Sequence, residues 1–291
     1  MNLEEPVLSQ YTKATIKAAL EEDIGSGDFT TLWSVPGDHR SRARIIARAG
    51  GVISGMPVAE YLTTLVDPSP TMISAIPDGQ TVSAGRVVAE LAGYTRPLLA
   101  IERTLLNFLQ RLSGISTLTR HFVEKVEGTG VKILDTRKTT PCLRELEKYA
   151  VRIGGGFNHR FGLYDYVLLK ENHISAAGSI RNAIEAIRAA NDIKLPVEIE
   201  TRTLDEVREA VQVGVSRIML DNMTVEQIRI AVEIIRDHKG GPIPEIEASG
   251  DINLRTIAEV AATGVDFISV GALTHSPGIL NLTMLIDVEP Y

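Results

Sequence analysis

The sequence predicts an α/β protein that consists of an N-terminal α+β sandwich domain and a C-terminal open (β/α) barrel with fewer than eight strands. Two observations support this fold class. After about residue 115, apolar strand-like runs alternate with amphipathic helical segments, which indicates a parallel sheet covered by helices. Before residue 97, short β-like runs separated by Pro and Gly predominate. With 291 residues, 44% of them hydrophobic, the chain can form one large domain or two smaller ones.

The N-terminal part begins with a short amphipathic helix over residues 12–22, which places Ile16, Ala19 and Leu20 on one side. A second helix is predicted in MPVAEYLTTLV. The predicted strands are ARIIARA, GVISG, TMISAI and RVVAELAG. This mixture of short strands and helices is typical of an α+β sandwich.

A long apolar helix is predicted from Pro97, in PLLAIERTLLNFLQRLSG. Arg103, Asn107 and Gln110 lie at i, i+4 and i+7 and form one polar stripe on this helix. Such a stripe is usually a solvent-exposed face. Because apolar residues flank this one on both sides, it could instead face a site or a partner chain.

The second part of the chain contains six predicted strands, or seven with an irregular element. They are VKILD (131–135), YVLLK (166–170), VEIE (197–200), RIMLD (217–221), EIEAS (245–249) and FISVG (267–271). The predicted helices are LRELEKYAVR, SIRNAIEAIRAA, LDEVREAVQV, VEQIRIAVEIIRDH and LRTIAEVAAT. This number favours an incomplete barrel over a complete (β/α)8 barrel. A doubly wound open sheet is the alternative, but the glycines of Gly154–Gly156 precede FNHR and form no GxGxxG fingerprint.

The chain has a formal charge of −7, yet cationic and imidazole side chains gather between Asp135 and His173. They are Arg137, Lys138, His159, Arg160, Lys170 and His173. A basic site in an acidic protein indicates a small, highly anionic ligand, because a nucleic-acid surface would normally make the domain itself basic.

The composition excludes several other classes. No stretch is long and apolar enough to span a bilayer, and MNLEEPVLSQ lacks the pattern of a secretory signal. We therefore expect a cytoplasmic protein without a membrane partner. Cys142 is the only cysteine, which excludes an internal disulfide and a Cys-based zinc cluster.

Polar or glycine residues end all six predicted strands, where parallel α/β barrels form their active sites. These residues are Asp135 followed by Thr136, Arg137 and Lys138, then Lys170, Glu200, Asp221, Ser249 with Gly250, and Gly271. The cations suit carboxylates or phosphates, and the acids suit Mg²⁺ or ribose hydroxyls. Glycine loops after late strands allow backbone N–H groups to approach a phosphate. The predicted ligands therefore combine phosphate, carboxylate and sugar.

Several ordered motifs resemble the quinolinate phosphoribosyltransferase family. They are LLNFLQRLSGIST, ILDTRKTTP, GGGFNHRFGLYDYVLLKENHI, VEIE, MLDN, EASGDI and ISVGALTHS, with GSGDFTT near Gly25. The resemblance implies a sandwich domain of residues 1–114, joined by the tail 276–291 near LTMLIDV, and a barrel of residues 115–275. It also implies transfer of the phosphoribosyl group from phosphoribosyl pyrophosphate (PRPP) to quinolinate with decarboxylation. The products are nicotinate mononucleotide, CO₂ and pyrophosphate.

The resemblance also implies site residues, Mg²⁺ as cofactor, and a homodimer or larger even assembly. The quinolinate site would contain Arg137, His159, Arg160, Lys170 and, from the neighbouring subunit, Arg103. The PRPP site would contain Thr136, Lys138, Lys170, Glu200, Asp221, Ser249, Gly250 and Gly271. Lys138, Lys170, Glu200 and Asp221 would be catalytic, and Glu200 and Asp221 would hold the metal directly or through water. Asp251 departs from the family pattern, which has a second glycine or an asparagine there.

Two enzymatic alternatives stay open. One is a Schiff-base barrel lyase with Lys170 as the amine nucleophile. The other is a paralogous phosphoribosyltransferase with a different acceptor, which would lack the paired arginines Arg137 and Arg160. A non-catalytic phosphate-binding module is a weaker alternative, because simple anion binding gains nothing from Glu200 and Asp221. His173 is interpreted as a residue that begins a helix or supports the site.

Overall fold

The computed structural model describes residues 8–288, which divide into two compact units. The sandwich unit contains the described chain through Arg120, Thr139–Gly155 and the described chain from Leu273 onward. The barrel unit contains His121–Lys138 and Gly156–Ala272. This division places residues 139–155 with the sandwich, whereas the predicted boundary at residue 114 stays a prediction.

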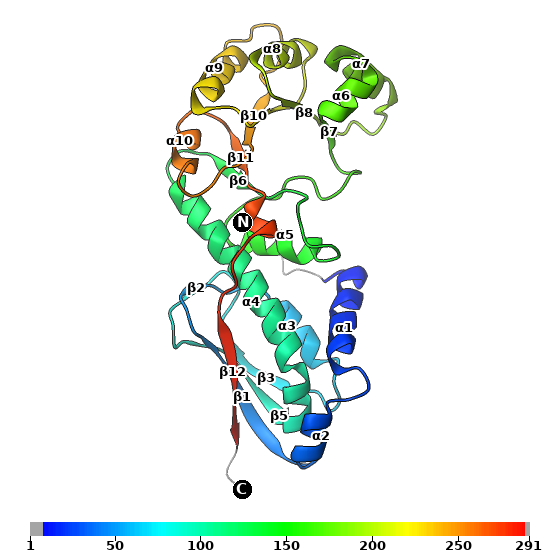
Figure 1. Ribbon diagram of the computed structural model, residues 1–291, viewed down its shortest axis with the longest axis vertical. Coiled ribbons are helices and arrows are strands. Elements are labelled where there is room, and N and C mark those ends of the chain that lie inside the picture. The colour runs from blue at the N-terminus through cyan, green and yellow to red at the C-terminus, as the bar shows by residue number, and fades with distance from the viewer. Residues whose placement is uncertain (1–7, 289–291) are drawn as a thin grey trace. The chain divides into compact units, whose positions relative to one another are not determined.

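The sandwich unit is built on a four-stranded antiparallel sheet with the order β12-β1-β5-β3 (Figure 1). The strands of this unit are β1 (Arg40–Ala47), β2 (Gly51–Val52), β3 (Thr71–Ala75), β4 (Thr81–Val82), β5 (Val87–Tyr94) and β12 (Leu282–Val288). In β1, Ser41, Ala43, Ile45 and Ala47 are buried, which is the period of two expected for a strand with one face on a core. β12 pairs with β1, so the LTMLIDV segment returns to this unit as the family resemblance implied.

The helices that lie wholly or mainly in the sandwich unit are α1 (Gln10–Ile24), α2 (Phe29–Ser34), α3 (Met56–Thr63), α4 (Thr95–Lys125), α5 (Arg144–Ile153) and α11 (Ala272–His275). Helix α4 has 31 residues and continues well beyond Gly114, where the predicted helix ended. Gly114 does not terminate it. A Cβ at this position would lie 2.0 Å from the backbone oxygen of Gly278, so the glycine allows two chain segments to approach closely.

The barrel unit contains a six-stranded parallel sheet with the order β6-β11-β10-β9-β8-β7 (Figure 1). Its strands are β6 (Lys132–Leu134), β7 (Val167–Leu169), β8 (Val197–Thr201), β9 (Arg217–Asp221), β10 (Glu245–Ser249) and β11 (Phe267–Ser269). All six predicted strands are confirmed, and the sheet is not a closed barrel. Beside β6, Phe157 forms an isolated parallel bridge with Leu134.

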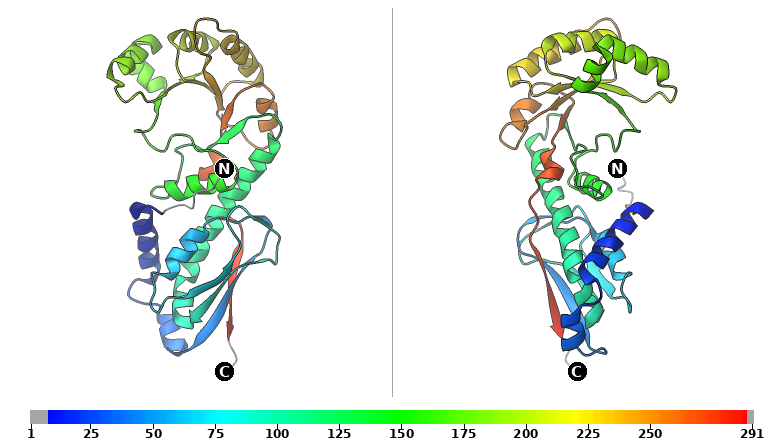
Figure 2. Two further views of the ribbon diagram at one scale, coloured as in Figure 1. Left: turned by 180° about the vertical axis from the view of Figure 1, so that it is seen from behind. Right: turned by 45° about the vertical axis from the view of Figure 1, so that its right-hand side comes forward.

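The helices of the barrel unit are α6 (Glu171–Ala177), α7 (Ile180–Ala190), α8 (Leu204–Val213), α9 (Val225–Arg236) and α10 (Ile257–Ala261). Figure 2 shows the successive helices covering one face of the sheet. Reciprocal capping bonds begin two of them, between Thr203 and Glu206 in α8 and between Thr224 and Gln227 in α9. No sequence pattern predicted α6, because this short helix buries none of its residues and therefore has no apolar stripe. No helix in the described part of the chain is long and apolar enough to cross a membrane.

Candidate active site

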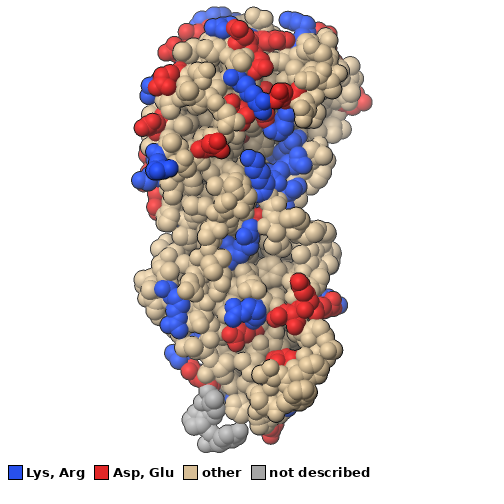
Figure 3. All heavy atoms as spheres, viewed as in Figure 1, with Lys and Arg blue, Asp and Glu red and all other residues tan. Residues whose placement is uncertain are grey.

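The parallel register brings the predicted strand-end residues to one edge of the barrel sheet. Ser249 is paired with Asp221, and Glu200 lies opposite Met219, two residues before the end of β9. Because the carboxyl ends of parallel strands meet at one edge, these side chains form a common rim. Figure 3 shows Lys and Arg side chains gathered beside Asp and Glu on a face of this unit. The barrel unit holds every predicted site residue except Arg103: Thr136, Arg137, Lys138, His159, Arg160, Lys170, Glu200, Asp221, Ser249, Gly250 and Gly271.

Buried Asp135 connects the two basic segments of the rim. Its Oδ2 accepts a hydrogen bond from Asn158 Nδ2 at 2.5 Å, and its Oδ1 accepts from the His159 backbone N–H at 2.9 Å. Just after Asp135, the Thr136 hydroxyl accepts from the Lys138 backbone N–H at 3.0 Å. This short turn follows the end of β6 and leaves the Lys138 side chain exposed. Asp135 therefore holds the DTRK and FNHR segments together, a role that its position at a strand end did not reveal.

Arg160 lies in a cationic environment. Its NH1 group donates to the backbone oxygen of Tyr166 at 3.1 Å. Burial and the nearby Arg137 guanidinium lower the pKa of Arg160, whereas the Glu198 charge raises it. Two guanidinium groups that repel one another are best stabilised by an anion between them, so the pair suits a ligand with two carboxylates.

The acidic side of the rim is paired with cations. Lys170 Nζ forms an ion pair with Glu200. Arg202 has its guanidinium 3.7 Å from Glu200 and 3.5 Å from Asp221, and it also pairs with Glu171. Sequence reasoning missed Arg202, although its position just beyond the end of β8 was an available signal. The exposed Arg202 balances carboxylates that would otherwise repel one another.

His173 has a structural role at the beginning of α6. Its Nδ1 accepts from the backbone N–H of Lys170, the N-cap residue of this helix, at 3.0 Å. The interpretation of His173 as a residue that begins a helix is confirmed. The same bond fixes the backbone of Lys170 at the rim.

Gly250 allows the loop after β10 to approach the loop after β9. The Asn222 backbone N–H donates to the Ser249 oxygen at 2.9 Å, and a Cβ on Gly250 would lie 2.2 Å from Asn222 Oδ1. Gly250 has φ +98°, and Asp251 follows with φ +43°. Asp251 is exposed, so its extra carboxylate is solvated. The predicted approach of this backbone to a phosphate stays a prediction, and the structure shows that the glycine also allows contact with the neighbouring loop.

We expect Gly250→Ala to destabilise the protein by about 1–3 kcal/mol, because alanine is strained at this φ and collides with Asn222. Thermal unfolding measures the loss. Gly241→Ala is the control, because a Cβ there meets no atom within 4 Å and φ is not positive. Equal unfolding temperatures for the two variants would contradict the packing argument.

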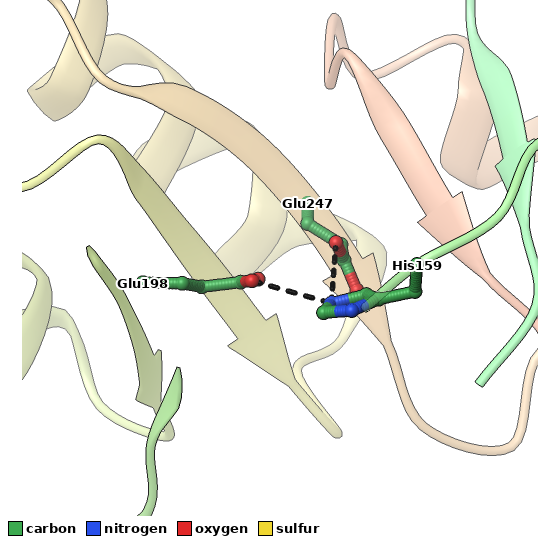
Figure 4. A group of neighbouring side chains, drawn as sticks. All are labelled: His159, Glu198 and Glu247. Carbon is green, nitrogen blue, oxygen red and sulfur yellow. Dashed lines mark ion pairs between the residues drawn. The ribbon is translucent and has the colours of Figure 1, made fainter. Parts of the chain in front are cut away.

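A buried polar layer lies below the rim. Its members are His159, Glu198 and Glu247, shown in Figure 4. His159 Nε2 is 3.2 Å from Glu198 Oε2 and 3.5 Å from Glu247 Oε2, and both glutamate side chains are fully buried. Arg217 NH1 is 3.2 Å from Glu247 Oε2. Neither glutamate was among the predicted site residues, although the alternation in VEIE and EIEAS places both on the face that carries Glu200 and Ser249.

Burial raises the pKa of Glu198 to about 7 and that of Glu247 to about 7, and for Glu247 the Glu198 charge acts in the same direction. An unperturbed Glu ionises near pH 4.5. Between these pH values the folded protein therefore binds more protons than the unfolded chain does. The free energy of unfolding consequently falls as the pH rises from about 4.5 to 7.

Glu247→Gln should flatten this pH dependence, because a neutral amide cannot ionise in either state. The measurement is the unfolding temperature at several pH values between about 4.5 and 7. Glu245→Gln is the matched control, because Glu245 lies on the same strand and contacts the same Arg217 but is 52% exposed. An unchanged slope in the Glu247 variant would show that Glu247 is ionised throughout.

Arg103 belongs to the sandwich unit, where its side chain is exposed on α4. Asn107 is also exposed, and Gln110 donates to the backbone oxygen of Leu282 at 2.8 Å. Only the first two members of the predicted stripe are therefore fully presented to solvent. The predicted entry of Arg103 into a neighbouring subunit's site stays a prediction.

Comparisons with known proteins agree along nearly the whole chain. Family models described as the C-terminal and N-terminal domains of quinolinate phosphoribosyl transferase match residues 115–285 and 28–113. A probable nicotinate-nucleotide pyrophosphorylase [carboxylating] from Synechocystis is 46% identical over 92% of this chain and 90% of its own length. One from Bacillus subtilis is 42% identical over 92% and 91%. The crystal structure of NadC from Streptococcus pyogenes superposes with a TM-score of 0.89 at 40% identity, covering 95% of this chain and 96% of that one.

Proposed function

This chain belongs to the quinolinate phosphoribosyltransferase family, and we propose from this premise how its rim carries out the reaction. The enzyme transfers the phosphoribosyl group of PRPP to quinolinate with decarboxylation, in the biosynthesis of NAD. Its substrates are quinolinate and PRPP. The observation that carries the proposed roles is the convergence of paired arginines and paired acids on one rim.

The two adjacent carboxylates of quinolinate bind to the cationic side of the rim. Arg137 and Arg160 lie close enough for their charges to interact, and a guanidinium can hold a carboxylate through two parallel hydrogen bonds. Lys170 adds an ammonium at the end of β7. Bound quinolinate relieves the repulsion between the arginines, so binding is strongest for a ligand with two negative groups.

PRPP occupies the remaining strand ends. Glu200 and Asp221 would hold its ribose hydroxyls and the metal, Lys138 would bind its pyrophosphate, and the Gly250 and Gly271 loops would bind its 5′-phosphate. Mg²⁺ commonly binds through one or two carboxylates together with substrate phosphates, so this acidic pair suits it. When bound, Mg²⁺ would neutralise charge on the departing pyrophosphate.

The chemistry needs positioning and charge neutralisation rather than a protein nucleophile. The ring nitrogen of quinolinate forms a bond to the anomeric carbon of PRPP as the bond to pyrophosphate breaks. Glu200 or Asp221 stabilises the positive charge that develops on the sugar. The ring nitrogen is then cationic, so the adjacent carboxylate leaves as CO₂. The electron pair remains on the ring carbon beside N⁺ and takes up a proton.

A Schiff-base lyase fits the rim less well. Lys170 is paired with Glu200, which suits a charged ammonium better than a neutral amine nucleophile. The family assignment supports the same choice. Trapping of a Lys170 adduct by borohydride in the presence of a carbonyl substrate would support the lyase.

The direct test supplies purified protein with quinolinate, PRPP and Mg²⁺. We expect equal amounts of nicotinate mononucleotide and CO₂, and no product when EDTA removes the metal. Nicotinate in place of quinolinate is the control for the acceptor, because it has one carboxylate fewer. Turnover of nicotinate but not of quinolinate would contradict the assignment of the acceptor.

The assembly and the location are further proposals. We propose a homodimer or larger even assembly in which exposed Arg103 on α4 completes the quinolinate site of a neighbouring subunit. We also propose a cytoplasmic location, which cell fractionation tests. Plant relatives are named as chloroplastic or mitochondrial, so recovery of this protein in an organelle is the outcome that would overturn the second proposal.

A further inference from the structure

Two buried glutamates lie on the inner face of the barrel sheet, one layer below the rim. Glu198 and Glu247 precede Glu200 and Ser249 by two residues on β8 and β10, so their side chains point to the same face as those of the rim residues. Both side chains have no exposed surface. The layer is therefore continuous with the substrate site but closed to solvent.

Packing alone does not explain these acids. Removing two carboxylates from water is costly, and an apolar side chain of similar volume would fill the interior with less loss of stability. Glu247 has Arg217 at 3.2 Å, and the imidazole of His159 lies 3.2 Å from Glu198. Both acids contact His159 of the FNHR segment. Their effect on the site is therefore expected in that segment.

His159 has close polar neighbours on both sides of its ring. Its Nδ1 accepts a hydrogen bond from the Arg160 backbone N–H at 2.6 Å, so this nitrogen carries no proton and Nε2 is the protonated one. The Nε2 side faces Glu198 and Glu247, as Figure 4 shows. The ring also meets Tyr166 edge to face, with centroids 5.9 Å apart. The acids therefore favour one tautomer and one orientation of the imidazole.

The imidazole of His159 contacts the backbone where the chain continues into Arg160. The backbone N–H of Arg160 donates to the imidazole of His159, and the guanidinium of Arg160 donates to the backbone oxygen of Tyr166. The charge of Glu198 also favours the Arg160 cation against the repulsion from Arg137. One buried layer thus acts on Arg160 through both geometry and charge.

We propose that Glu198 and Glu247 are positioning residues for quinolinate, which act through His159 to direct the Arg160 guanidinium towards the dicarboxylate. This proposal rests on the assignment of Arg160 to the quinolinate site made above. Neither acid touches the substrate. Their effect is to hold Arg160 in the binding orientation before the ligand arrives, which reduces the ordering cost of binding.

The test compares Glu247→Gln with Glu245→Gln in the full-length enzyme. Both variants remove one carboxylate near Arg217, but only Glu247 lies beside His159. We expect E247Q to raise the KM for quinolinate about tenfold or more, since small displacements of positioning groups have large effects. The KM for PRPP should change less than about twofold, as should both constants in E245Q. Calorimetry with phthalate, which presents two adjacent carboxylates without the reacting nitrogen, should show the same selective loss.

A spectroscopic measurement separates positioning from a general loss of structure. In protein with ¹⁵N-labelled histidine, the ring signals of His159, identified from a His159→Gln variant, should shift in E247Q and not in E245Q. Unchanged ring signals, or equal increases in both KM values, would overturn the proposal.

If E247Q does not fold, His159→Gln tests the same route, and an unchanged quinolinate KM in that variant also overturns the proposal. An inactive wild-type protein would contradict the proposed function, whereas an active wild type with equal E247Q and E245Q variants would contradict only this inference.

Discussion

Replacing Arg137 with alanine is expected to weaken quinolinate binding far more than PRPP binding. Each hydrogen bond to a charged group contributes about 1.5–3 kcal/mol, so loss of a two-bond guanidinium–carboxylate contact should raise the KM for quinolinate by about a hundredfold or more. Arg160 would then be the only remaining member of the arginine pair. Steady-state kinetics with each substrate varied in turn measure the two effects separately.

Two further variants sharpen this prediction. Arg137→Lys keeps the charge but loses the planar fork, so we expect an intermediate loss if two-bond recognition matters. Arg208→Ala is the control, because it removes an exposed arginine on α8 whose ion-pair partner, Asp205, is also exposed. Equal losses for quinolinate and PRPP in Arg137→Ala would contradict its assignment to the acceptor.

A mixture of two inactive variants is expected to recover activity. Arg103→Ala removes the residue proposed to enter from the neighbouring subunit, and Lys170→Ala removes a residue of the subunit's own rim. In a mixed dimer, one barrel keeps Lys170 and receives an intact Arg103, whereas the other site lacks both. After random exchange in equal amounts, about one quarter of all sites should be intact, which is a large gain over either variant alone.

The mixing experiment needs proof that subunits exchange. Differently tagged chains purified through both tags isolate the mixed assembly, in which about half the sites should be active. A mixture of Lys170→Ala with Glu200→Ala is the matched control, because both residues lie in the same barrel unit and pair with one another. That mixture should recover nothing. Absence of recovery in confirmed Arg103/Lys170 mixed assemblies would refute the shared site.

Sequence periodicity was sufficient to predict the elements with strong local patterns. The strands RIMLD and EIEAS coincide with β9 and β10, and LDEVREAVQV coincides with α8. Prediction failed where the local signal was weak or had another cause. Helix α6 buries no residue, so no apolar stripe marked it. The predicted helix ends at Gly114, but this residue lies within α4. A glycine is needed there because a Cβ would collide with the backbone of Gly278.

The rim was also predictable, because each of its residues follows an apolar run that ends on one edge of a parallel sheet. The interaction partners of these rim residues could not be predicted from the sequence. The sequence did not show that Arg202 would lie between Glu200 and Asp221, or that Asp135 would hold the FNHR segment. These contacts depend on the directions of side chains from separate strands and loops, which local periodicity does not specify.

By itself, the sequence determined the strand order along the chain, the strand ends at which a site is predicted, and the family to which those motifs belong. Only the tertiary structure decided that His159, Glu198 and Glu247 would meet in a buried layer. A glutamate inside a strand is locally the same residue whether it faces water or the interior. The register of β8 and β10 with their neighbours removes both acids from water and places them against the imidazole, and that burial sets their charge and their effect on the site.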